Sequence, residues 1–326
     1  MKNRILGKSG LQVSEVGLGC WQLGGDFGPV EAERAQQVLA AAQKTGINFW
    51  DTADVYGSGL SEKRIEQYLQ QNNFDAVVTT KVGRDGALYP DGYSKEKVRA
   101  NIQGSAKRLG VDTIDLVQLH CVPHEVIMAG DILAWMEDLQ SDGLIRAFGA
   151  SVETIDEALF TAAHPSITSL QIIFNLFRQN AIDELLPMAQ AKDVGIIVRL
   201  PLASGVLSGK MHAGQQFAPT DHRNYNRHGE AFSQGETFSG IPFDTALGFV
   251  ERMKPWLPDG MSMVQMAMRW ILDQPAVSTV IAGASRPEQV LQNASASDLP
   301  SLSEELHGKL ADLYRNEIET EICVPI

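Results

Sequence analysis

Short runs of apolar residues alternate along most of the chain with longer stretches of helical periodicity. Runs of this length rich in Val, Ile and Leu, separated by helical patterns, are typical of βα units that build a parallel sheet. The predicted strands are Val16–Gly19, Ile47–Asp51, Ala76–Lys81, Asp115–His120, Ile145–Gly149, Ser169–Ile172, Ile196–Leu200 and Thr279–Ile281. The predicted helices begin near Glu31, Ser61, Ser94, Val126, Thr154, Ile182, Asp244 and Pro287.

Eight such repeats favour a closed (β/α)8 TIM barrel, an α/β fold, over an open doubly wound sheet. The turn after the first strand, Gly17 to Gly28, has no GxGxxG between strand and helix, which argues against a Rossmann fold. Residues 2–13 are expected to form a β-hairpin across the bottom of the barrel, and Ser303–Tyr314 a final helix. We therefore expect residues 1–326 to form a single barrel domain.

The longest irregular segment, Ser204 to Pro242, follows the seventh predicted strand. Loops of this length are usually functional or disordered, and this one leaves the C-terminal end of a strand, so it could close over a ligand. It contains His212, His222 and His228, but no carboxylate or Cys stands beside them at ligand spacing. Solvated loop histidines are far more common than metal ligands, so no metal site is expected.

Composition narrows the classes of partner. The chain has 27 basic and 40 acidic residues, a formal charge of −13, without any block of Lys and Arg. Nucleic acid and anionic membrane surfaces are therefore not expected partners. The three cysteines lie far apart, which fits a reducing compartment, and no segment has the length of a signal peptide or membrane span, so we expect a cytoplasmic protein. The sequence leaves the oligomeric state open.

Polar side chains stand at the ends of three neighbouring predicted strands. Asp51, Lys81 and His120 end the second, third and fourth strands, and Tyr56 lies in the loop after Asp51. Each alone has an ordinary structural explanation, such as a helix cap, a solvated lysine, a core histidine or a packed tyrosine. Because C-terminal strand ends of a barrel share one mouth, where ionisable groups lose hydration unless they pair, the four together predict a catalytic site.

The chemistry of these four residues is coherent. A phenol has a pKa of about 10, and the Lys81 ammonium is expected to lower the pKa of Tyr56. Asp51 can hold Lys81 charged and in place, while His120 can orient a carbonyl oxygen. The set fits proton donation to an oxygen that gains negative charge. Carbonyl reduction is the plain candidate, and its hydride must come from a cofactor.

Several segments that contain these residues resemble the aldo-keto reductase family. They are DTADVYGSGLSE, TTKVG, IDLVQLH, GLIRAFGASVE and IAGASRPEQVLQN, and the similarity runs in family order from about Leu11 to Asn293. The resemblance implies a (β/α)8 barrel in which Asp51, Tyr56, Lys81 and His120 form the catalytic tetrad. It also implies a nicotinamide cofactor, usually NADPH, that lies extended across the barrel mouth.

The resemblance also assigns cofactor-binding residues position by position. Ser151 and Gln171 match the residues that hold the nicotinamide carboxamide, and Leu202, Ser204 and Lys210 would lie along the pyrophosphate. The full set is Trp21, Ser151, Gln171, Arg199, Leu200, Pro201, Leu202, Ser204, Lys210, Gly283, Ser285, Arg286, Gln289, Gln292 and Asn293. Arg286 is the expected contact to a 2′-phosphate, so NADP(H) is favoured over NAD(H).

Three positions depart from the family pattern. Arg199 stands where many members stack an aromatic residue on the nicotinamide, so the ring would meet a guanidinium. Gly283 replaces a Lys found in some members, and Cys121 follows His120 where an aromatic residue is frequent. The first two affect cofactor preference and redox direction, and the third suggests a roomier substrate pocket.

The expected substrate is a small-molecule aldehyde, ketone or sugar carbonyl. Phe27, Tyr89 and Trp256 are candidates to line its pocket. Two alternatives stay open. Lys81 could form a Schiff base in an aldolase-type barrel, or the chain could be a non-catalytic nicotinamide-sensing subunit, since some members of the family accompany ion channels.

Overall fold

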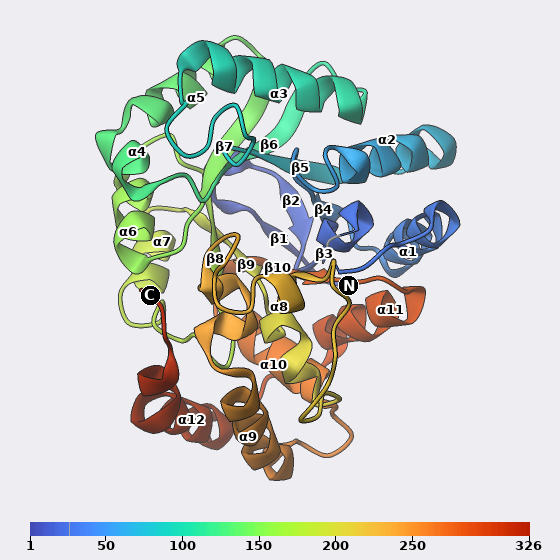
Figure 1. Cartoon of the computed structure of the whole chain (residues 1–326), viewed down its shortest axis with the longest axis vertical. Coiled ribbons are helices and arrows are strands. Elements are labelled where there is room, and N and C mark those ends of the chain that lie inside the picture. The colour runs from blue at the N-terminus through green and yellow to red at the C-terminus, as the bar shows by residue number, and fades with distance from the viewer. Residues whose placement is uncertain (26) are drawn as a thin grey trace.

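Eight parallel strands close into a barrel at the centre of the chain, in a computed structural model that describes residues 1–25 and 27–326 (Figure 1). The barrel strands are β3 (Val16–Gly19), β4 (Phe49–Asp51), β5 (Val77–Val82), β6 (Ile114–His120), β7 (Ile145–Ser151), β8 (Ser169–Ile173), β9 (Gly195–Arg199) and β10 (Val277–Gly283). They pair in chain order, and β10 pairs with both β9 and β3. The predicted (β/α)8 barrel is confirmed.

The α-helices are α1 (Ala32–Thr45), α2 (Leu60–Asn72), α3 (Lys95–Leu109), α4 (His124–Ala129), α5 (Asp131–Ser141), α6 (Ile155–Ala163), α7 (Leu185–Ala191), α8 (His222–Tyr225), α9 (Phe243–Met253), α10 (Met263–Leu272), α11 (Pro287–Ala294) and α12 (Glu304–Leu313). Most of them lie around the outside of the barrel, whereas α8 belongs to the segment at its mouth (Figure 1). No helix within the described ranges combines the length and the apolar character that a bilayer crossing requires.

Local sequence explains several helix boundaries. The Ser94 hydroxyl accepts a hydrogen bond from the Lys97 backbone N–H (3.3 Å) and so caps the N-terminus of α3. Thr154 and Glu157 form a reciprocal capping box at the start of α6. Both helices therefore begin where the sequence predicts.

Three helix predictions need correction. The helix expected near Val126 is two helices, α4 and α5, because Gly130 between them adopts a left-handed conformation (φ 83°). The helix expected near Ile182 begins only at Leu185, since Ile182 first closes a turn onto the Gln179 carbonyl (3.0 Å). The helix expected near Asp244 is α9, and α10, which follows it, was not predicted as a separate helix.

The N-terminal hairpin closes one end of the barrel. Strands β1 (Asn3–Ile5) and β2 (Gln12–Ser14) are antiparallel, and Leu6 and Val13 pack against residues of the barrel interior such as Phe49 and Leu116. A Cβ on Gly7 would lie 2.4 Å from the Gly195 backbone nitrogen, at the start of β9, so the turn fits there only with glycine. The hairpin is thus the predicted plug at the barrel bottom.

The long segment after β9 is more ordered than its sequence suggests. It contains helix α8 and several 3-10 turns, including Gln234–Glu236 and Phe238–Gly240. The Ser204 hydroxyl donates to the Glu236 carbonyl (2.9 Å) and accepts from the Phe238 N–H (3.2 Å). These bonds fold the segment back onto its own start at the barrel mouth.

Candidate active site

The four predicted catalytic residues meet at the C-terminal ends of β4, β5 and β6. The Lys81 ammonium donates to the Asp51 carboxylate (2.6 Å), the Thr52 carbonyl (2.8 Å) and the Tyr56 hydroxyl (3.1 Å). The His120 ring lies 6.0 Å from the Tyr56 ring between centroids and nearly perpendicular to it. Tyr56, Lys81 and Asp51 thus form one hydrogen-bonded chain, with His120 beside the phenol.

Burial and charge set the ionisation of this group. Burial raises the pKa of Tyr56 to about 12, with Asp51 adding to the rise and Lys81 opposing it. The predicted lowering by Lys81 is therefore present but outweighed. For Lys81 itself, burial lowers the pKa, but the charge and hydrogen-bond interactions with Asp51 and Tyr56 together raise it by more. The net shift is upward, and the amine stays protonated.

His120 is held neutral. Burial and the nearby positive charges of Arg84, Lys81 and Arg199 lower its pKa well below the ordinary value. Its Nδ1 is buried and has no hydrogen-bond partner among the described residues. A neutral imidazole can donate a hydrogen bond to a carbonyl oxygen without carrying charge into the site.

Close backbone packing positions Tyr56. A Cβ on Gly24 would lie 2.6 Å from the Tyr56 carbonyl carbon, so the turn after β3 can touch the Tyr56 loop only through glycine. On the same turn, the Trp21 ring stacks on the Tyr56 ring with centroids 5.8 Å apart. The loop after β4 is therefore fixed by the loop after β3.

A cavity of about 320 Å³ begins at Asp51, Tyr56 and His120 and extends toward β10 and α11. All fifteen predicted cofactor residues line it, together with Gln22 and Phe27. Beside Asp51, the Gln171 amide donates to the Asp51 carboxylate (2.7 Å). At the far end, Gln289 accepts hydrogen bonds from the Ser285 backbone N–H (2.9 Å) and the Arg286 backbone N–H (3.1 Å). The residues are assembled in one place, and their roles stay predictions.

The aldo/keto reductase family model matches residues 15–315. The chain belongs to this family. The resemblance seen in the sequence is thereby confirmed, and with it the assignment of the chain as an oxidoreductase of the aldo/keto reductase type.

Individual relatives span nearly the whole chain. A probable voltage-gated potassium channel subunit beta from Oryza sativa is 30% identical, over 97% of this chain and 98% of its own length. An NADH-specific methylglyoxal reductase from Escherichia coli is 28% identical, over 92% of this chain and 94% of its own length. The structure of the glycerol dehydrogenase AKR11B4 from Gluconobacter oxydans has a TM-score of 0.78 and 27% identity, covering 99% of this chain and 97% of that one.

This aldo/keto reductase holds Arg199 through polar contacts rather than leaving it free. One guanidinium nitrogen donates to the Val152 carbonyl (3.2 Å) and to the Cys121 sulfur (3.5 Å), and another lies 3.5 Å from the Glu236 carboxylate. The positive charge expected beside the nicotinamide position is therefore largely offset by Glu236.

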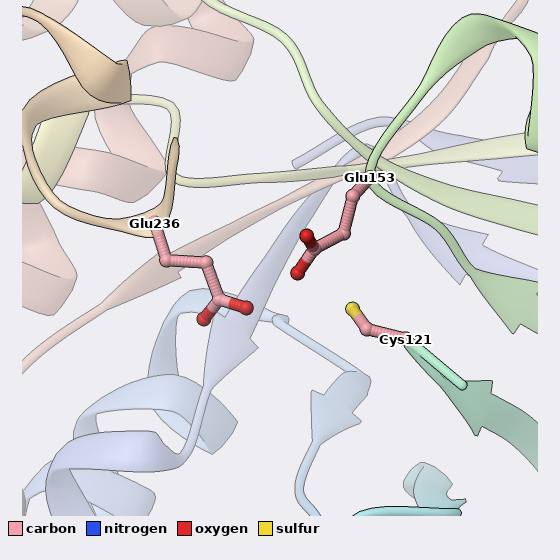
Figure 2. Close-up of side chains that lie close together, drawn as sticks. All are labelled: Cys121, Glu153 and Glu236. Atoms are coloured by element: carbon pink, nitrogen blue, oxygen red, sulfur yellow. The ribbon is translucent and has the colours of Figure 1, made fainter. Parts of the chain in front are cut away.

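Arg199 belongs to a cluster of four charged side chains, in which Arg199 and Glu236 are buried and Arg84 and Glu153 are partly exposed. Arg84 lies 2.9 Å from the Glu153 carboxylate and 2.8 Å from that of Glu236. Figure 2 shows Glu153 and Glu236 converging with Cys121, the residue after His120, and their ligand atoms lie within 4.8 Å of one another. We call Arg84, Glu153, Arg199 and Glu236 the charge cluster.

The charge cluster is balanced by arginine and does not favour a cation. Glu153 and Glu236 contribute two negative charges, and Arg84 and Arg199 two positive ones. Burial also raises the pKa of the Cys121 thiol, which keeps it neutral and a poor ligand. Among the described residues, the one group with donor atoms spaced for a metal is Cys121, Glu153 and Glu236. The loop histidines considered in the sequence are not part of it.

A second cavity, of about 820 Å³, adjoins the first at Tyr56 and His120. Trp21, Tyr56, His120, Cys121 and Glu236 line both cavities. The second cavity is further lined by Tyr89, Arg84, Glu153 and Phe232, and by Val324 near the C-terminus. Of the residues expected to line the substrate pocket, Tyr89 lines the second cavity, whereas Phe27 lines only the first. Trp256 lines neither of these two cavities and packs against the core.

Sequence reasoning missed Arg84, Glu153 and Glu236. Arg84 and Glu153 stand only three and two residues after Lys81 and Ser151, so their positions after strand ends were a usable signal. Glu236 lies deep in the loop after β9, where no periodicity fixes which side chain turns inward.

Proposed function

We propose that this chain is an NADP(H)-dependent reductase that converts the carbonyl of an aldehyde, ketone or sugar to an alcohol, with Tyr56 as proton donor. The observation that carries the proposal is the Tyr56 hydroxyl, 3.1 Å from the Lys81 ammonium and located where the two cavities meet. A carbonyl in the second cavity would lie against this phenol and His120. The carbonyl carbon would then be open to the first cavity, where the nicotinamide is proposed to bind.

The first cavity suits a nicotinamide dinucleotide. It is elongated from Tyr56 to α11 and carries Lys210 and Arg286 for phosphate groups. The Gln22 side-chain oxygen is buried there without a hydrogen-bond partner among the described residues, and an amide or ribose hydroxyl would satisfy it. When bound, the reduced cofactor supplies the hydride that no side chain can supply.

The side chains then perform the proton chemistry. His120, neutral and lining both cavities, is suited to orient the carbonyl oxygen by a hydrogen bond. Tyr56 donates its proton as the oxygen gains negative charge, and the Lys81 ammonium stabilises the phenolate left behind. Asp51 keeps Lys81 charged and aimed at the phenol.

NADP(H) rather than NAD(H) is proposed because the Arg286 side chain is exposed at the start of α11. The Arg286 backbone N–H is held there by a hydrogen bond to the Gln289 side chain. Guanidinium groups bind phosphate strongly. The Escherichia coli relative is NADH-specific, so cofactor preference is tested by direct measurement.

The test of cofactor preference is a titration with NADPH and NADH, followed by tryptophan fluorescence because Trp21 lines the first cavity. NADPH should bind more tightly. Arg286→Ala should weaken NADPH by about tenfold or more and leave NADH nearly unchanged. Equal loss for both cofactors would show that Arg286 does not contact the 2′-phosphate.

The test of activity is loss of NADPH absorbance with a panel of aldehydes, ketones and sugars. The alternative of a nicotinamide-sensing subunit has support from the potassium channel subunit beta relative. Tight NADPH binding without turnover of any carbonyl in the panel would favour that alternative. The Schiff-base alternative is disfavoured, because Lys81 is protonated by its pair with Asp51 and a protonated amine is not a nucleophile.

A further inference from the structure

The second cavity has one polar wall, and it lies next to the reacting end of the proposed site. Trp21, Phe232 and Tyr89 supply aromatic surface. Arg84 and Glu153 supply the polar wall, and the Glu153 carboxylate lies within 4.8 Å of the Cys121 sulfur. Cys121 directly follows His120, so a group bound at this wall is close to a carbonyl held by His120 and Tyr56.

The wall does not select an anion. Arg84 is already shared between Glu153 and Glu236, at 2.9 and 2.8 Å. Glu157 and Glu230 also line the cavity. A carboxylate or phosphate on the substrate would therefore meet more negative than positive charge, and like charges in a partly desolvated site repel.

The wall instead offers hydrogen-bond acceptors. An ionised carboxylate has several acceptor sites and no donor. The Glu153 side chain is 27% exposed, against 7% for Glu236, which lies between two guanidiniums. Glu153 therefore keeps acceptor capacity toward the cavity, and the complementary group on a neutral ligand is a hydroxyl.

We propose that Glu153 accepts a hydrogen bond from a substrate hydroxyl near the carbonyl, and that the substrate is an uncharged polyhydroxy carbonyl compound of the aldose or ketose class. This inference rests on the proposed function. In the reaction the carbonyl carbon takes a hydride from the reduced nicotinamide and the oxygen takes the Tyr56 proton. The sugar carbonyl becomes an alcohol, the nicotinamide is oxidised, and solvent returns the proton to Tyr56.

The experiment compares kcat/KM for DL-glyceraldehyde, which carries hydroxyls, with propanal, which does not, using NADPH. The ratio should favour glyceraldehyde by about tenfold or more, because its hydroxyl can donate to the charged Glu153 acceptor and propanal has no such hydroxyl. Glu153→Ala should reduce this ratio by about the same factor through loss of glyceraldehyde activity alone. Comparing the ratio between variants removes the effect of aldehyde hydration.

The matched control is Glu304→Gln, which removes one negative charge at an exposed position that lines neither of the two cavities. It should leave the ratio unchanged. NADPH affinity of Glu153→Ala should equal that of the wild type if the fold is intact. If Glu153→Ala binds NADPH more weakly than the wild type, Glu153→Gln replaces it as the test. Glu153→Gln keeps an acceptor oxygen and the side-chain volume, and it should retain part of the preference for glyceraldehyde over propanal.

Each outcome decides. A wild-type enzyme that reduces both aldehydes with similar kcat/KM, or a ratio that survives Glu153→Ala, overturns the inference and leaves the proposed function standing. A higher kcat/KM for glyoxylate, an anionic aldehyde, than for glyceraldehyde overturns the inference that the substrate is uncharged. Failure to reduce propanal and every other carbonyl despite NADPH binding overturns the proposed function itself.

Discussion

At the scale of single residues, the chemistry of the proposed site depends on Tyr56. The sequence predicts that Tyr56 lies close to Lys81, and in the structure the Tyr56 hydroxyl is 3.1 Å from the Lys81 ammonium nitrogen. What the sequence could not provide is the balance of effects on the phenol. Burial and Asp51 outweigh Lys81 and raise the pKa of Tyr56 to about 12. The sequence does not show this burial, because it depends on loops that pack over the ring.

This shift predicts the pH dependence of the reaction. Reduction uses the protonated phenol, which persists below a pKa of about 12, so kcat for reduction with saturating NADPH should not fall between about pH 6 and about pH 9. Alcohol oxidation uses the phenolate and should accelerate as the pH rises. Rates measured in both directions across this range check the prediction. A reductive rate that falls with a midpoint near neutral pH would contradict it.

At the scale of elements, the strand ends were the most predictable part of the site. Periodicity placed β4, β5 and β6 closely enough to align Asp51, Lys81 and His120. The loop contacts were not predictable in the same way. The approach of the Gly24 turn to the Tyr56 loop, for example, depends on two segments that carry no shared pattern.

Gly24→Ala tests whether that approach positions Tyr56. The new methyl would lie 2.6 Å from the Tyr56 carbonyl carbon, so one loop must move. We expect a loss of about 1–3 kcal/mol in the free energy of unfolding and a marked fall in kcat. Gly86→Ala is the control, because nothing lies within 4 Å of a Cβ there, and it should change neither quantity. Unchanged kcat in Gly24→Ala would show that the contact is not needed to position the phenol.

At the scale of the whole molecule, the barrel and its plug followed from the repeat pattern, but the charge cluster did not. Its members come from the segments after β5 and β7, from the end of β9 and from the following loop. Such a group cannot be predicted from the sequence, because its members are far apart along the chain. Only the closed barrel and the folded loop bring Glu236 to Arg84 and Arg199. The cluster therefore joins the loop after β9 to the barrel.

Glu236→Gln tests this connection. The variant leaves two guanidiniums without their shared carboxylate, and breaking a buried pair costs about 3–5 kcal/mol. Urea unfolding should show a loss in the free energy of unfolding that approaches this range, and limited proteolysis should cut residues 204–242 faster. Glu317→Gln, which breaks the exposed pair with Arg252, should cost less than about 1 kcal/mol. Equal costs for the two variants would contradict a structural role for the cluster.

The most direct measurement of the central claim is a single-turnover reaction of the NADPH-bound protein with glyceraldehyde, for the wild type and Tyr56→Phe. The substitution removes the proton donor and spares the cofactor cavity. We predict that the rate of NADPH oxidation falls by about a hundredfold to ten-thousandfold while NADPH affinity stays the same. A Tyr56→Phe variant that oxidises NADPH at the wild-type rate would contradict the account.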